Sequence, residues 1–174
     1  MKRNRIILLL LLLSSYSNPL FPQKMKKMYK KEVQIALDRT KDSNPGILNE
    51  SDMQHLPDIV KKYLHYTGVV GKEKVWNFRV EFDGRIRQNN TDSWMKLKSV
   101  QYNFVQNPTR IFYIEAKKMG IPAKGIHLYK EATAIMVIKL AGLFKIADAR
   151  GAEMNQGETV TVFNDMCFMA PATL

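Results

Sequence analysis

The side chains best suited to chemistry lie near the C-terminal end of the sequence, between residues 147 and 170. Four carboxylates share this stretch: Asp148, Glu153, Glu158 and Asp165. Paired carboxylates can act as general acid and base, or bind a hard cation through their oxygens. The alternative is a structural role, because Asn155 and Glu158 have the spacing of a helix-capping box and Asp148 ends a strand-like segment. In that second interpretation Asp165 lies on the solvent side of the helix.

A second candidate site combines a histidine with polar side chains of neighbouring strand-like segments. His127 and Tyr129 lie in one segment, and Tyr113 and Glu115 lie in another. A histidine oriented by a carboxylate can act as a base, whereas a hydrogen-bonded core histidine is the structural alternative. We assign no residue to catalysis and expect ligand contacts from these four residues and from three of the carboxylates: Asp148, Glu153 and Glu158.

Several common active-site patterns do not occur in the sequence. The three histidines never form a His-x-x-x-His pair and Cys167 is the only cysteine, so we expect no zinc site and a buried structural thiol. Gly-x-Ser-x-Gly, Gly-x-Gly-x-x-Gly and the P-loop are also missing. The sequence therefore predicts no metal and no nucleotide cofactor.

The N-terminal residues have the features of an export signal. Lys2, Arg3 and Arg5 precede an unbroken apolar run over residues 6–13, and a small-x-small cleavage pattern ends at Ser17. Eight helical residues rise only about 12 Å, far less than the ~30 Å of a bilayer core. Residues 1–17 thus predict a signal peptide, with a short membrane anchor as the alternative, and an exported protein of the cell envelope.

A basic cluster follows, within an expected basic helix and linker over residues 18–50. The chain has a net charge of +11, and five lysines lie close together: Lys24, Lys26, Lys27, Lys30 and Lys31. They could bind an anionic membrane surface, or form the solvated face of a helix running to about Asp38. Basic residues do not alternate with aromatic ones, so we expect no nucleic-acid binding.

Residues 51–174 have the pattern of one α+β domain. A capping box at residues 51–54 and a glycine at position 68 bound a short helix. Alternating apolar residues then predict a strongly curved antiparallel meander, with a β-bulge near residues 98–100. A final helix follows, which would bury Val160, Phe163 and Cys167. The expected strands cover residues 76–82, 85–87, 94–104, 110–116, 126–130, 133–140 and 143–148.

Two motifs connect the chain to a known family. The motifs are Leu56-Pro57-x-x-Val60-x-x-Tyr63-Leu64 and Asp148-x-x-Gly151-x-Glu153-Met154-x-x-Gly157-Glu158. Over residues 52–174 the chain resembles an uncharacterised bacterial domain-of-unknown-function family, whose members often have a hydrophobic N-terminal segment. The resemblance implies no activity. Members of the family are longer, which suggests a domain that is incomplete at its C-terminal end.

The expected fold is also similar to lipoprotein-carrier half-barrels, in which helices lie in the concavity of a curved sheet. This similarity implies a partial half-barrel here, with an N-terminal and a C-terminal helix packed on it. We therefore expect an envelope protein that binds a lipid or another hydrophobic molecule in the concavity. Two alternatives stay open: a hydrolase-like enzyme using Glu115, His127 or the C-terminal carboxylates, and a membrane-associated structural domain.

Overall fold

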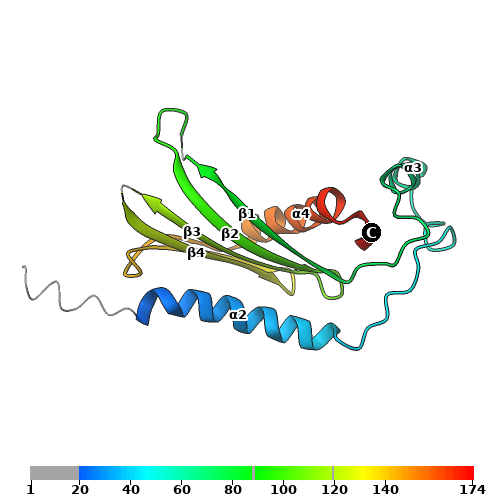
Figure 1. Cartoon of the computed structure of the whole chain (residues 1–174), viewed down its shortest axis with the longest axis horizontal. Coiled ribbons are helices and arrows are strands. Elements are labelled where there is room, and N and C mark those ends of the chain that lie inside the picture. Colours follow the sequence, from blue (N-terminus) through cyan, green and yellow to red (C-terminus); the bar gives the residue numbers. More distant parts are fainter. Residues whose placement is uncertain (1–19, 88, 119) are drawn as a thin grey trace, which may run out of the picture.

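The strands of the chain form one open antiparallel sheet in sequence order, a meander (Figure 1). The computed structural model describes residues 20–87, 89–118 and 120–174, so the predicted leader over residues 1–17 lies outside the described residues. Six strands occur in the described part of the chain: β1 (Asn77–Ile86), β2 (Met95–Phe104), β3 (Thr109–Lys118), β4 (Ile121–Lys130), β5 (Thr133–Leu140) and β6 (Phe144–Ala149). The predicted α+β class and curved meander are confirmed.

A helix lies on each face of this sheet. Helix α2 (Leu20–Thr40) lies along one face, and helix α4 (Ala152–Met169) lies on the other (Figure 1). On strand β3, Ile111 and Tyr113 are buried on the α2 face, whereas Arg110 and Phe112 point to the α4 face. The two apolar faces predicted for this strand therefore each have a helix against them.

Helix α2 contributes directly to the core. Tyr29, Val33 and Ala36 are buried against β3 and β4, and the Tyr29 and Tyr113 rings lie 5.8 Å apart. The C-terminal end of α2 is fixed by Arg39, whose guanidinium donates to the Gln106 carbonyl. The apolar stripe of α2 faces the sheet, and the lysines of its predicted cluster are exposed: Lys24, Lys26, Lys27, Lys30 and Lys31.

Helix α3 (Asp58–Thr67) belongs to a separate small core at one end of the sheet. Leu48, Met53 and Leu64 are buried there, beside Leu174 after the short 3-10 helix η1 (Pro171–Thr173). Gly68 ends α3 as predicted, because its φ of 72° is in the left-handed region. The predicted capping box at residues 51–54 is wrong: these residues form turns, and α3 begins after Pro57.

Three predicted details of the sheet are also wrong. Strand β1 continues through Gly84 to Ile86, and β2 pairs with both neighbours in an unbroken register, without the bulge expected near residues 98–100. The change in apolar parity along β2 needs no bulge, because Leu97 and Val100 lie on opposite apolar faces. Strand β4 begins at Ile121, before the expected residue 126. The register shifts between β5 and β6 instead, at Ile138 and Lys139.

The C-terminal helix begins earlier than expected, and its predicted inner face is only partly right: Cys167 is partly buried, but Val160 and Phe163 are not. Helix α4 starts at Ala152, so Asn155 and Glu158 are not a capping box; the Asn155 side chain instead accepts a hydrogen bond from the Ala134 N–H. Val160 and Phe163 are more than half exposed, and Val162 is buried in their place. The helix is apolar on both sides, so apolar spacing alone did not identify its inner face.

Candidate functional site

A buried cluster of polar side chains lies between α4 and the sheet. Its centre is Arg110 on β3, whose side chain is only 10% exposed. The guanidinium Nε lies 2.9 Å from Asp165 Oδ2, and Nη1 lies 3.1 Å from Glu158 Oε2. Glu158 and Asp165 are seven residues apart and therefore share one face of α4. One strand arginine thus binds both inward carboxylates of the helix.

Two amides of strand β2 complete the cluster. Gln101 accepts a hydrogen bond from Arg110 Nη2 at 2.9 Å and donates to Asp165 Oδ2 at 2.6 Å. Asn103 donates to the same Asp165 oxygen at 3.2 Å. Antiparallel register places Asn103 opposite Arg110, so these side chains share the α4 face. We refer to Arg110, Gln101, Asn103, Glu158 and Asp165 as the arginine cluster.

His127 lies beside the arginine cluster, but its Nε2 forms no hydrogen bond with the residues of the cluster. Its Nε2 lies 3.3 Å from Glu158 Oε1 without the alignment of a hydrogen bond, and is a buried nitrogen without a partner among the described residues. Burial and the Arg110 charge lower the pKa of His127 to about 4, so the ring is neutral at pH 7. Burial raises the pKa of Glu158 above its usual range, although Arg110 opposes this shift. Among the described residues, Glu158 is the carboxylate within ion-pair distance of His127.

The structure distributes the seven predicted site residues over three places. His127, Tyr129 and Glu158 are on the α4 side, where the Tyr129 hydroxyl lies 2.8 Å from Thr159 Oγ1. Tyr113 and Glu115 are on the opposite face, where the Tyr113 hydroxyl donates to Glu115 at 2.6 Å. The remaining two are exposed near the sheet edge and α4 start: Asp148 and Glu153.

The pKa shifts at the outlying residues follow from their neighbours. The Tyr113 hydroxyl and the Lys124 ammonium lower the pKa of Glu115. Burial and the hydrogen bond from the Tyr113 hydroxyl to Glu115 raise the pKa of Tyr113. Hydrogen bonds from Lys145 and Arg150 lower the pKa of Asp148. These contacts are ordinary ion pairs and a hydrogen bond, and they do not unite the seven residues in one site.

Sequence reasoning missed Arg110, Gln101 and Asn103, and it placed Asp165 on the solvent side of its helix. That placement is wrong, because the Asp165 side chain is only 16% exposed and accepts three hydrogen bonds from the sheet. The seven-residue spacing of the two α4 carboxylates was the available signal. Within the described residues no group of three metal-ligating side chains occurs, and no helix is long and apolar enough to span a membrane.

Beyond the arginine cluster, the α4 face continues as an apolar surface. Two cross-strand rows form it, and we call them the uncovered strip. The first row is Phe82, Ser99, Ile114, Gly125, Ile138 and Ala147; the second is Gly84, Leu97, Ala116, Ala123, Leu140 and Phe144. Helix α4 contacts the other end of this face, at residues such as Ala134 and Arg110. Phe82 and Phe144 are 43% and 67% exposed.

The comparisons with known proteins concern the family alone. No curated protein and no solved structure matches the chain. The model of a family of unknown function, DUF6544, matches residues 46–174, which include α3, the whole sheet and α4. The match covers most of the chain, and this chain belongs to the family of unknown function DUF6544.

Proposed function

We propose that this chain is a cell-envelope protein that binds a lipid or another apolar ligand on the uncovered strip. The part of the proposal that concerns export rests on the sequence of residues 1–17. The part that concerns the ligand rests on one observation, namely the different burial of the two faces of the same central strands.

On the α2 face the residues of these strands that lie under helix α2 are buried. Ile111 and Ile126 are 0% and 2% exposed there. On the α4 face of the same strands Ile114, Ala116 and Ala123 are partly buried, whereas Ser99 and Gly125 of the strip are buried. Of the twelve positions in the uncovered strip only Ser99 is polar, and an apolar surface of this extent is characteristic of a binding surface.

The strip also has polar groups at one border, as ligand sites usually do. The adjoining row places Gln101, Phe112 and His127 side by side across β2, β3 and β4. His127 lies in this row with a neutral ring, and its buried Nε2 faces Glu158. An acyl chain on the strip would bury apolar surface at roughly 0.8 kcal/mol per CH₂.

Binding of a fluorescent fatty-acid analogue to the delipidated full chain tests the proposal. The double variant Ala116→Gln and Leu140→Gln adds polar groups to the strip at partly exposed positions, and we expect it to weaken binding at least about 10-fold. The matched control is Val160→Gln and Phe163→Gln, which changes the exposed side of α4 and is expected to bind like the parent chain. Far-UV circular dichroism verifies that both variants fold.

Two results would overturn the proposal. If the strip variant binds the probe as well as the parent chain, the strip is not the site. If the α4 control loses binding instead, the ligand occupies the apolar groove between α3 and α4, a space of about 790 Å³ that Phe163 and Tyr66 line. Native mass spectrometry of the purified full chain gives an independent measurement, because a co-purifying acyl ligand adds a defined mass.

A further inference from the structure

The end of the sheet at which α2 begins carries an unusual set of charges on the α2 face. We call it the distal end. Two contacts show how α2 is oriented: Lys26, near the start of α2, is close enough to lower the pKa of Glu115, whereas Arg39 at the other end of α2 binds the β2–β3 turn. One cross-strand row alternates in sign and then becomes wholly cationic. It consists of Asp83, Lys98, Glu115, Lys124, Lys139 and Lys145.

The next row toward the tip of the distal end contains cations and no acid. Arg85 lies directly opposite Lys96, and Lys117 lies opposite Pro122. Within the described residues no ion pair involves Arg85, Lys96 or Lys117, whereas Lys98 and Lys124 pair with Asp83 and Glu115. Like charges in directly opposed positions destabilise an antiparallel pair, so the sheet alone does not explain this row. We call Arg85, Lys96 and Lys117 the cationic row.

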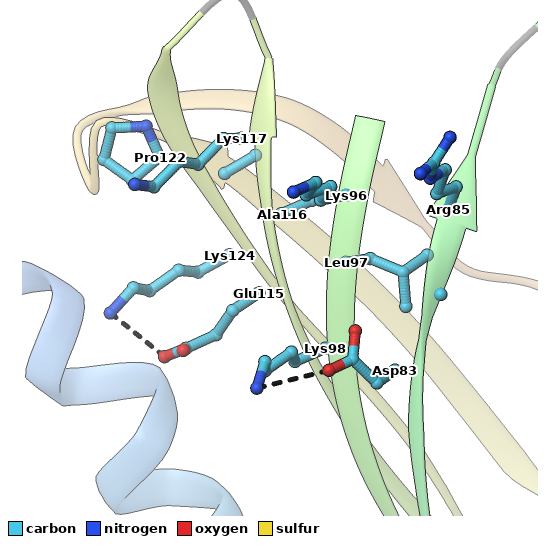
Figure 2. A pocket seen from close by; sticks show the side chains of 12 residues that line it. Asp83, Arg85, Lys96, Leu97, Lys98, Glu115, Ala116, Lys117, Pro122 and Lys124 are labelled. Atoms are coloured by element: carbon cyan, nitrogen blue, oxygen red, sulfur yellow. Dashed lines mark ion pairs between the residues drawn. The ribbon is translucent and has the colours of Figure 1, made fainter. Parts of the chain in front are cut away.

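These side chains line an open basin of about 740 Å³, which Figure 2 shows from close by. Lys124, Glu115 and Lys98 point to the side of the sheet on which α2 lies (Figure 2). A neighbouring groove of about 780 Å³ joins the basin to α2, because Lys98 lines it together with Lys26 and Lys30. The groove therefore connects the strand cations with the lysine cluster of the helix across a lining of mixed charge, which also includes Glu81, Asp83 and Glu115.

Exposed apolar side chains surround this cationic surface. Trp94 is 55% exposed at the start of β2, and its ring lies 4.6 Å from the Arg87 guanidinium. The turns at the same end present Ile121, Leu143 and Phe144, each more than 40% exposed. Cations beside an exposed tryptophan and aliphatic tips suit the interface of an anionic bilayer, where phosphates meet acyl chains. A nucleic acid offers phosphates but no apolar phase for the aliphatic residues.

We infer that the distal end is a docking surface for an anionic lipid bilayer. The cationic row and the α2 lysines bind headgroup phosphates there, and Trp94 enters the interfacial layer. Helix α2 begins at this same end, and the predicted leader precedes it in the sequence. The inference concerns the charged side chains and the turns of the distal end and does not depend on the proposed ligand, although the basin borders four residues of the uncovered strip: Gly84, Leu97, Ala116 and Ala123.

The test uses the full chain and vesicles of phosphatidylcholine, alone or mixed with phosphatidylglycerol, with brominated acyl chains as quenchers. We expect quenching of Trp94 fluorescence only with the anionic vesicles, and weaker binding as salt rises. A Trp94→Phe variant measures the background from Trp76. This readout follows the strand tips, so attachment through any other part of the chain would not produce it.

Charge reversal identifies the residues responsible. The triple variant Arg85→Glu, Lys96→Glu and Lys117→Glu is expected to lower vesicle binding on the order of 100-fold or more. The matched control reverses three exposed lysines away from the distal end: Lys41, Lys62 and Lys72. It changes the net charge equally and should retain most of the binding and the quenching.

Three outcomes would overturn the inference: an equal loss in the control variant, unquenched Trp94 in chains that sediment with anionic vesicles, and tighter binding to a DNA duplex than to vesicles. The first would show a net-charge effect, the second attachment elsewhere, and the third a nucleic-acid surface. The fatty-acid probe should bind the triple variant normally, so failure here is distinguishable from failure of the ligand proposal.

Discussion

Replacing Arg110 by Met should destabilise the fold severely, although the two side chains have similar lengths. The substitution removes the ion pairs to Glu158 and Asp165 at 3.1 and 2.9 Å, and it leaves two carboxylates that are at most 16% exposed. Breaking a buried ion pair from one side costs about 3–5 kcal/mol. Because small domains are stable by only about 5–15 kcal/mol, this loss is a large fraction of the total.

Urea unfolding at pH 7, followed by circular dichroism and tryptophan fluorescence, measures this cost. The triple variant Arg110→Met, Glu158→Gln and Asp165→Asn removes the stranded charges and should recover most of the lost stability. The reasoning is refuted if Arg110→Met alone costs less than about 1 kcal/mol, or if the triple variant is no more stable than the single one.

The same variant has a defined pH dependence. Burial already raises the pKa of Glu158, and Arg110 limits that rise, so its removal moves the folded-state pKa still higher. A group whose pKa is higher in the folded than in the unfolded state stabilises the fold at low pH, and that stability is lost as the pH rises. The deficit of Arg110→Met should therefore be greatest near pH 7 and shrink toward pH 4.

Two further predictions concern the surroundings of the cluster. The pKa of His127 is about 4 in the fold and 6.5 in its ordinary state, so its contribution to stability is lost as the pH falls from 6.5 to 4, by up to about 3 kcal/mol. In urea titrations the unfolding free energy of His127→Gln should fall less between pH 6.5 and 4 than that of the parent chain, whereas the exposed control His55→Gln should behave like the parent. Identical pH profiles of the two variants would contradict the lowered pKa of His127. Gly125→Ala should cost about 1–3 kcal/mol in thermal unfolding, because the new Cβ would lie 2.9 Å from Ile114 Cγ2. At Gly84 a Cβ meets nothing within 4 Å, so an equal cost for Gly84→Ala would show a general effect of the strand glycines.

The meander could be predicted from sequence because its information is local. Alternation from Trp76 to Phe82 and the two apolar faces of residues 110–116 are patterns within single strands, and each strand pairs only with its neighbours in sequence. The face of α4 could not be predicted, because Val160 and Phe163 are as apolar as the buried Val162, and the choice depends on what the sheet offers.

Local sequence patterns do not reveal the arginine cluster, for a related reason. Gln101 and Asn103 alternate with Val100 and Tyr102, which is the pattern of a solvent-facing strand side. Their partner Asp165 is more than 60 residues away in the sequence, and only the fold brings it to them. The fold decides which of these distant residues come together. In the sequence, the spacing of Glu158 and Asp165 was the one local sign of the cluster.

The position of α2 in the sequence has a consequence for synthesis. The helix emerges first, but its sheet partners emerge much later, since Arg39 binds Thr109 across 70 residues. At about 5–20 residues per second, the interval is roughly 4–14 s. During that interval Tyr29, Val33 and Ala36 have no sheet to cover them. A nascent chain of this protein therefore carries an amphipathic, lysine-rich helix with an uncovered apolar side before its sheet has formed.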